Sequence, residues 1–220
     1  MSGFPKVVLF DLDGTLLDSA PDMLATINAM KAARDELPLA LADLRPHVSK
    51  GSRAMIGAAF PTWDDAKRLA HVPEFLEIYA RESGLHGQPF PGVEAFLQVL
   101  EDAGVRWGIV TNKPEYLARD IVGKLGWMER SEVLIGGDTL AERKPHPLPL
   151  LHAAAEMEAH IDDCVYVGDD ARDIEAARAA QMRSVVALWG YRLEGEAPDT
   201  WGADAMVEDV SELCAEDAWP

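Results

Sequence analysis

The sequence predicts an α/β protein: a Rossmann-like parallel sheet core with an all-α subdomain inserted near its N-terminus. Short apolar runs alternate with longer helical patterns along most of the chain, which is typical of βαβ units. Polar clusters follow four of these apolar runs directly, as ligand-binding loops do at the carboxyl ends of parallel strands. The stretch from Ser19 to about Gln88 differs, because its apolar spacing is helical and it contains no convincing strand.

The core elements follow from the apolar runs and from helix start and stop signals. Strands are expected at Lys6–Phe10, Arg106–Val110, Val133–Ile135, Cys164–Val167, Ser184–Leu188 and, more weakly, Ala205–Val207. Helices are expected between them at Val93–Ala103, Glu115–Leu125, Leu148–Ala159 and Ala171–Ala180. Strands that alternate with helices in this order pair in parallel, so the core is predicted to be one parallel sheet.

The inserted segment begins at a clear helix start, in which Ser19 precedes Pro21 and Asp22. Helices are expected at Pro21–Arg34, Leu41–Val48, Ser52–Ala59 and Asp64–Ser83. The glycine- and proline-rich Gly87–Gly92 is the predicted return to the core. We therefore expect a catalytic core formed by residues 1–17 and 89–220, with a helical cap at residues 18–88.

Composition limits the kinds of partner. The 220 residues are 48% hydrophobic, enough for a real core, and carry a formal charge of −18. An acidic chain repels phosphodiester backbones and anionic lipid, so nucleic-acid and membrane-surface binding are disfavoured. Only four apolar residues precede Asp11, too few for a secretory signal, and no apolar run approaches a membrane span. We expect a cytoplasmic protein whose partner is a small metabolite held by local cations.

Four polar clusters, each just after a predicted strand, carry the chemistry. They are Asp11-Leu12-Asp13-Gly14-Thr15, Thr111-Asn112-Lys113, Arg143-Lys144-Pro145 and Asp169-Asp170 with Asp173 after. Each has an ordinary explanation when taken alone: a turn, a helix N-cap, or a solvated charge pair. Because parallel strands present their carboxyl ends at one edge of a sheet, we expect all four clusters to converge there.

Their convergence favours a phosphoryl-transfer site. Crowded carboxylates repel one another unless a cation neutralises them, and a set of oxygen ligands without His or Cys suits Mg²⁺. One carboxylate can attack phosphorus, and a second can protonate the leaving oxygen. Lys144 can spread the charge of the transferring phosphoryl group, Thr111 offers a hydroxyl, and the helix starting near Pro114 offers free N–H groups.

The motifs hhhFDLDGTL, hhTN, KP and hhGDDxxD, in this order, resemble those of the haloacid dehalogenase superfamily of phosphatases. The resemblance spans nearly the whole chain and implies a Rossmann-like core with Asp11 as nucleophile and Asp13 as general acid and base. It implies that Thr111 binds the phosphoryl group, with Asn112 beside it at the substrate, and that Lys144 steadies the charge.

The same resemblance implies a Mg²⁺ site. Its ligands are expected to be Asp11, the carbonyl oxygen of Asp13, and Asp169, with Asp173 supporting them. Asp170 stands where relatives often have serine, so a supporting role and a helix cap are both open.

The insert narrows the comparison within the superfamily. The segment between Asp13 and Thr111 is long enough for a helical cap, whereas that between Thr111 and Lys144 is too short for a second one. This is similar to phosphoglycolate phosphatases, phosphosugar mutases and dehalogenases, although Asp13 argues against a dehalogenase. SKGSRAMIGAAF, VGDDARDIEAARAA and WGAD resemble N-acetylmuramic acid 6-phosphate phosphatases, a branch commonly labelled phosphoglycolate phosphatase.

One polar break in the cap, formed by Lys50, Gly51, Ser52 and Arg53, is the expected site of substrate recognition. Gly51 permits a tight turn, and Arg53 can pair bidentately with a carboxylate, which both 2-phosphoglycolate and the lactyl group of N-acetylmuramic acid 6-phosphate carry. A solvated loop between helices is nearly as good an explanation.

The predicted function is Mg²⁺-dependent hydrolysis of a small phosphomonoester through an aspartyl-phosphate. The resemblance favours N-acetylmuramic acid 6-phosphate as the substrate, with 2-phosphoglycolate as the other candidate. Two alternatives stay open. A phosphosugar mutase shares every core motif, and an aspartate-phosphorylated signalling switch also places acidic residues, Thr and Lys at strand ends. A monomer and a homodimer are both compatible with the sequence.

Overall fold

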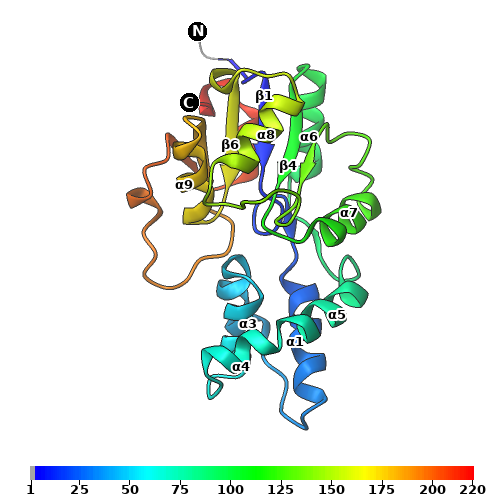
Figure 1. Cartoon of the computed structure of the whole chain (residues 1–220). Coiled ribbons are helices and arrows are strands. Elements are labelled where there is room, and N and C mark those ends of the chain that lie inside the picture. The colour runs from blue at the N-terminus through cyan, green and yellow to red at the C-terminus, as the bar shows by residue number, and fades with distance from the viewer. Residues whose placement is uncertain (1–2) are drawn as a thin grey trace. The chain divides into compact units, whose positions relative to one another are not determined.

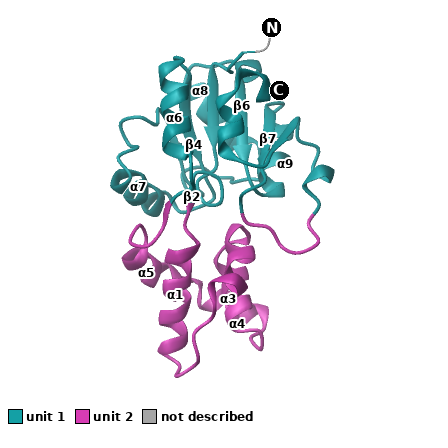
Figure 2. Ribbon diagram, turned by 180° about the vertical axis from the view of Figure 1, so that it is seen from behind, with its two compact units in different colours: residues 1–17, 89–190, 197–220 teal, residues 18–88, 191–196 magenta. Residues whose placement is uncertain are grey.

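A computed structural model describes residues 3–220 and divides the chain into two compact units (Figure 2). Unit 1 contains the chain up to Leu17, Pro89–Gly190 and Ala197–Pro220. Unit 2 contains Asp18–Gln88 and Tyr191–Glu196. The segment 191–196, which the sequence pattern assigns to the core, therefore groups with the helical unit.

Unit 1 is built on a parallel sheet of six strands in the order β5-β4-β1-β6-β7-β8 (Figure 1). The strands are β1 (Val7–Phe10), β4 (Arg106–Val110), β5 (Leu134–Ile135), β6 (Cys164–Gly168), β7 (Arg183–Ala187) and β8 (Ala205–Val207). In the register, Leu9 of β1 lies between Gly108 of β4 and Tyr166 of β6. The α/β, Rossmann-like fold class is confirmed. The order also reverses direction at β1, where open sheets of this kind bind ligands.

Helices cover both faces of this sheet, which is why its strands are apolar on both sides. They are α6 (Val93–Asp102), α7 (Glu115–Lys124), α8 (Leu148–Glu156) and α9 (Ala171–Ala179). Apolar residues of α8 and α9 pack with Val7 and Leu9 of β1 in one core cluster. On the other face, Phe10 contacts Phe96 of α6 edge-on, with ring centroids 5.9 Å apart. Alternate residues of β1 thus serve opposite faces.

Short 3-10 segments complete unit 1. They are η2 (Ile161–Asp163), η3 (Pro198–Thr200), η4 (Val210–Cys214) and η5 (Glu216–Ala218). No helix among residues 3–220 is long and apolar enough to cross a bilayer.

Unit 2 is helical, and two short strands mark where the chain enters and leaves it. These strands are β2 (Leu17–Asp18) and β3 (Gln88–Pro89), which pair with each other. The helices are α1 (Ala20–Ala32), α2 (Leu41–Leu44), η1 (Arg45–Lys50), α3 (Ser52–Ala59), α4 (Asp65–Ala70) and α5 (Val72–Glu82). The prediction of a single helix at residues 64–83 is wrong, because α4 ends before His71 and α5 begins after it. Pro73 lies in the first turn of α5, where the N–H group that proline lacks would have no partner within the helix.

Asp22 joins the two ends of the inserted segment. This buried side chain of α1 accepts hydrogen bonds from the backbone N–H groups of Gly84, His86 and Gly87, at 2.9, 2.7 and 3.1 Å. A carboxylate that satisfies three N–H groups ties the far end of the insert back to its first helix.

Segment 191–196 joins this unit through Tyr191. Its hydroxyl donates to Asp18 Oδ1 at 2.7 Å and accepts from the N–H of Ala20 at 3.1 Å. These bonds explain why the segment groups with unit 2 although the chain reaches it from β7.

Candidate active site

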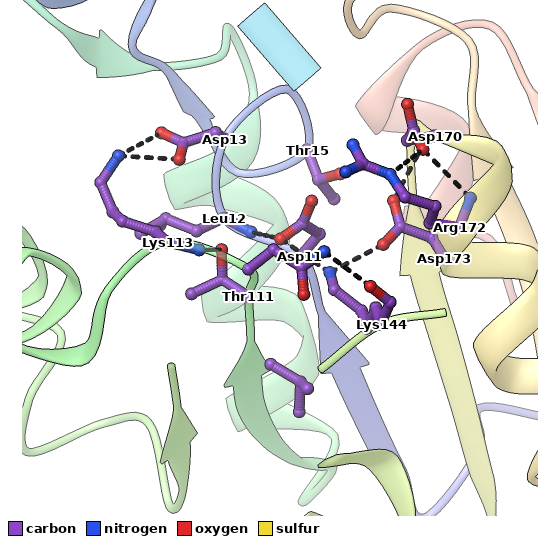
Figure 3. A network of polar contacts seen from close by, with 12 residues as sticks. Asp11, Leu12, Asp13, Thr15, Thr111, Lys113, Lys144, Asp170, Arg172 and Asp173 are labelled. Atoms are coloured by element: carbon purple, nitrogen blue, oxygen red, sulfur yellow. Dashed lines mark hydrogen bonds and ion pairs between the residues drawn. The ribbon is translucent and has the colours of Figure 1, made fainter. Parts of the chain in front are cut away.

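The four polar clusters all stand at the carboxyl ends of strands of unit 1. Asp11 follows β1, Thr111 follows β4 and Asp169 follows β6, while Lys144 lies in the long loop after β5. Lys144 Nζ lies 3.0 Å from Asp11 Oδ1 and 2.7 Å from Asp173 Oδ1, so three of the clusters meet in direct contact (Figure 3). The predicted convergence at one sheet edge is thus present in the structure.

Asp11 is a buried carboxylate with one oxygen occupied. Its Oδ1 accepts the N–H of Leu12 at 2.8 Å and faces Lys144, whereas no hydrogen bond among the described residues ends on Oδ2. Burial raises the pKa of Asp11 to about 6, and the nearby charge of Asp173 adds to the rise, although Lys144 opposes it. The side chain is therefore a desolvated carboxylate that retains one oxygen for chemistry.

Lys144 is buried, with 2% of its surface exposed, and is held from three sides. Besides the two carboxylates, its ammonium donates to the hydroxyl of Tyr166 at 2.6 Å. Burial opposes the charged form, but the carboxylates of Asp11 and Asp173 outweigh it, so the pKa of Lys144 is raised. A fixed positive charge beside Asp11 is what a phosphoryl group needs.

The carboxylates of Asp11, Asp169 and Asp173 can offer ligand atoms within 4.8 Å of one another. Two glycines make room for Asp169: a methyl group on Gly14 or on Gly190 would come within 2.2 Å of its side chain. Gly14 also has a φ of +86°, which disfavours other residues. Because the cluster offers only oxygen atoms, it fits a hard cation such as Mg²⁺.

Asp173 and Asp170 form a capping box at the start of α9. Asp170 accepts the N–H of Arg172 at 3.0 Å, and Asp173 Oδ2 accepts the N–H of Asp170 at 3.0 Å. Asp170 also pairs with the guanidinium of Arg172 at 2.7 Å. The structure thus gives Asp170 the helix-cap role. Both oxygens of Asp173 are occupied, which suits a supporting residue.

Thr111 and Asn112 are placed by backbone and loop contacts. Thr111 is buried, and its Oγ1 accepts the N–H of Lys113 at 3.2 Å. Asn112 donates its amide to the carbonyl oxygen of Lys144 at 2.9 Å, while its own buried Oδ1 has no partner within residues 3–220. The structure therefore shows Asn112 supporting the Lys144 loop, and a direct contact with substrate stays a prediction.

At the start of α7, one of the N–H groups expected to be free for an anion is already occupied. The N–H of Glu115, the first residue of the helix, donates to Asp138 Oδ1 at 2.7 Å. This N–H group is therefore already satisfied by a carboxylate of its own chain.

Asp13 is held by a residue that sequence reasoning missed. Both of its oxygens accept from Lys113 Nζ, at 3.0 and 2.7 Å, and Figure 3 shows the pair turned away from Asp11 and Lys144. The signal was present, since a lysine directly follows Thr111-Asn112 at a strand end. The pattern alone does not say which carboxylate such a cation meets.

The four cap residues belong to unit 2, whereas the carboxylates belong to unit 1. Lys50 ends η1 and pairs with Glu196 at 2.6 Å. Gly51 has a φ of +86° and caps α3, whose first residue is Ser52, and Arg53 is exposed. The tight turn expected at Gly51 is present, and the contact of these residues with substrate stays a prediction.

Comparison with known proteins places this geometry in a family. The model of the haloacid dehalogenase-like hydrolases matches residues 5–181. The chain belongs to this family. The matched region contains Asp11, Asp13, Thr111, Lys144 and Asp169.

Individual relatives of this haloacid dehalogenase-like hydrolase are phosphatases. A phosphoglycolate phosphatase of Xanthomonas campestris pv. campestris (strain 8004) is 62% identical over 217 residues, covering 99% of this chain and 98% of the relative. An N-acetylmuramic acid 6-phosphate phosphatase of Pseudomonas aeruginosa is 40% identical and covers 94% and 92%. A crystal structure of a predicted phosphoglycolate phosphatase from Haemophilus somnus 129pt matches with a TM-score of 0.81 at 25% identity, covering 97% of both chains. The chain is a phosphatase of this family.

Proposed function

We propose that this phosphatase hydrolyses a small phosphomonoester with Mg²⁺, through an aspartyl-phosphate formed on Asp11. The observation that carries the proposal is the arrangement around Asp11. Lys144 and the Leu12 N–H both contact Oδ1, and Oδ2 is left to attack phosphorus. A carboxylate attack of this kind divides one difficult displacement into two easier steps.

The side chains divide the work between them. Asp11 attacks, and the phosphorus–ester oxygen bond breaks as the new bond to Oδ2 forms. Asp13 gives the leaving oxygen its proton and later takes one from the water that cleaves the aspartyl-phosphate, so Asp11 is regenerated. Lys144 and Thr111 hold the phosphoryl oxygens while charge builds on them. The buried surroundings strengthen these charge interactions relative to bulk water.

Mg²⁺ would be held by Asp11, Asp169 and the carbonyl oxygen of Asp13, and it would neutralise the phosphoryl charge. Asp173 supports this site by fixing Lys144 and the start of α9.

We favour 2-phosphoglycolate as the substrate, with N-acetylmuramic acid 6-phosphate as the second candidate. Relatives whose names carry phosphoglycolate are up to 62% identical, while those named for the amino-sugar phosphate are 40% and 42% identical. The signalling-switch alternative is set aside because the chain is a phosphatase. A phosphosugar mutase shares the core motifs and would interconvert isomers and release little phosphate.

A substrate panel tests the proposal. With Mg²⁺, the protein should release phosphate from 2-phosphoglycolate faster than from hexose phosphates or N-acetylmuramic acid 6-phosphate, and a chelator should remove the activity. Phosphate release measured over time for each compound gives kcat/KM. Full activity in chelator would contradict the metal, and isomer interconversion without phosphate release would favour the mutase.

Asp13→Asn tests the general acid. We expect kcat to fall about 100-fold on an alkyl phosphate but less than about tenfold on an aryl phosphate, because a good leaving group needs no proton. The measurement is kcat for both substrates with wild type and variant. Equal losses on both would exclude Asp13 as the leaving-group acid while leaving Asp11 as the nucleophile untouched.

A further inference from the structure

Lys113 is a second buried lysine beside the reacting carboxylates, and the mechanism above gives it no role. Its side chain is 2% exposed, and its ammonium donates to both oxygens of Asp13. Its main chain is fixed as well: its N–H donates to Thr111 Oγ1 at 3.2 Å, and its carbonyl accepts from Gly137 N–H at 2.7 Å. These bonds fix the backbone from which the ammonium reaches Asp13.

This pair conflicts with the task of Asp13. Both oxygens accept from Lys113, so the carboxylate faces the lysine and is turned away from Asp11, beside which the alcohol departs. In the reacting complex at least one of them has to turn toward the substrate, which leaves a buried ammonium with fewer acceptors. A buried charge that loses an acceptor is destabilised unless another group replaces that acceptor. The substrate itself is the natural source of the replacement, since Asp13 turns only when a substrate is present.

Geometry restricts which substrate group can serve. Lys113 Nζ donates a hydrogen bond to Asp13. In the proposed mechanism, Asp13 must also come within hydrogen-bonding distance of the ester oxygen. An anion that reaches Lys113 must therefore lie close to the ester oxygen. A carboxylate on the carbon that bears the phosphoester meets this condition. The carboxylate of N-acetylmuramic acid 6-phosphate does not, because a sugar ring separates it from the phosphoester.

We propose that Lys113 is the substrate-carboxylate residue: the carboxylate of a 2-phosphorylated carboxylic acid replaces Asp13 on Lys113 and so releases Asp13 to act. This inference rests on the proposed function and names its substrate class. It assigns specificity to unit 1, next to the chemistry, rather than to Arg53 of the cap. A substrate with a neutral group in this position cannot complete the exchange and should be turned over slowly.

A matched pair of substrates tests this exchange. 2-Phosphoglycolate and 2-hydroxyethyl phosphate share a primary ester oxygen, and only the first has a carboxylate. For wild type we expect kcat/KM to favour 2-phosphoglycolate by at least about tenfold. Lys113→Met should lower kcat/KM for 2-phosphoglycolate roughly 10–100-fold and change 2-hydroxyethyl phosphate only a few-fold, the loss expected for one charge-assisted hydrogen bond. The ratio of the two values does not depend on how much of the protein is folded.

Two further variants sharpen the comparison. Lys124→Met removes a half-exposed lysine of α7 that pairs with Asp120 at 2.8 Å, and it should leave the ratio unchanged. Lys113→Arg keeps a cation and should restore part of the preference. If Lys113→Met does not fold, Lys113→Gln removes the same charge but keeps a polar side chain. It should lower the ratio of kcat/KM for 2-phosphoglycolate to that for 2-hydroxyethyl phosphate by the same factor.

Each outcome decides between the hypotheses. Equal losses on both substrates, or no loss, would overturn the carboxylate role of Lys113, and the phosphatase chemistry would stand. Equal kcat/KM values of wild type for 2-phosphoglycolate and 2-hydroxyethyl phosphate would also overturn the carboxylate role of Lys113. An equally large loss on N-acetylmuramic acid 6-phosphate would overturn the restriction to an adjacent carboxylate. If wild type releases phosphate from none of these compounds or an aryl phosphate, the proposed function itself fails.

Discussion

Asp11→Asn will lower turnover by at least about 10⁴-fold, because an amide oxygen is a poor nucleophile and the variant cannot form the covalent intermediate. The same change will make the metal-free protein harder to unfold at neutral pH. Lower activity combined with higher stability is expected when a buried charged side chain is needed for catalysis but destabilises the folded protein.

The sign of the stability effect follows from the pKa of Asp11, which burial raises from 3.8 to about 6. The folded state then holds this proton more tightly than the unfolded state. The contribution to stability is fully present below the unfolded pKa and is lost as pH rises through the window that ends near 6. Above it, the ionised carboxylate costs the folded protein on the order of 1–3 kcal/mol. Asparagine is neutral throughout, so it removes this cost.

Thermal unfolding in chelator, with wild type and Asp11→Asn at several pH values, measures the effect. The variant should melt roughly 5 °C higher above pH 6, and the difference should shrink as pH falls toward 4. Adding Mg²⁺ should raise the melting temperature of wild type more than that of the variant, which lacks one ligand. Substantial turnover by Asp11→Asn, or a variant that melts lower in chelator at neutral pH, would refute this account.

Much of the core could be predicted because its signals are local and repeated. The strand β1 is apolar at every position, and its length and position were evident from the run before Asp11. Strand ends in a parallel sheet share one edge, so the topology alone predicts that Asp11, Lys144 and Asp173 meet.

What the sequence did not show depends on contacts between distant residues. The grouping of segment 191–196 with unit 2 rests on bonds from Tyr191 to Asp18 and Ala20, which no local pattern encodes. The break at His71 does have a local signal in Pro73, which starts a new helix, but the helical residues on both sides of it favour one continuous helix. The pairing of Lys113 with Asp13 joins the ends of two strands, and many side-chain arrangements satisfy the same strand order.

Lys144→Met will have the second-largest effect, and here activity and stability should fall together. The side chain faces Asp11 at 3.0 Å and Asp173 at 2.7 Å, with both carboxylates buried. Removing a charge that contacts both leaves them with much less compensation, since the Arg172 guanidinium acts on them only from farther away. We expect the free energy of unfolding to drop by about 3–5 kcal/mol. Activity should fall about 10³-fold, because a fixed charge on the transferring phosphoryl group is lost.

Tyr166→Phe is the matched control. It deletes the hydroxyl that accepts from Lys144 at 2.6 Å and donates to Val110 O at 2.7 Å, but it keeps every charge. The loss should be about 1 kcal/mol in stability and less than about tenfold in activity. A loss as large as that of Lys144→Met would mean that packing at this point, rather than charge, carries the effect.

The dependence on pH and metal separates a charge effect from a packing defect in Lys144→Met. Lys144 lowers the pKa of Asp11, so its removal should raise that pKa beyond about 6. The variant should then lose stability as pH rises through a window that ends higher than in wild type, and should regain part of it when Mg²⁺ neutralises the carboxylates. Unfolding in denaturant at pH 5 and pH 8, with and without Mg²⁺, measures both the pH dependence of the stability loss and its recovery with Mg²⁺. A deficit that is equal under all four conditions would show that Lys144 stabilises the protein through its packing, and the carboxylates would then need another source of compensation.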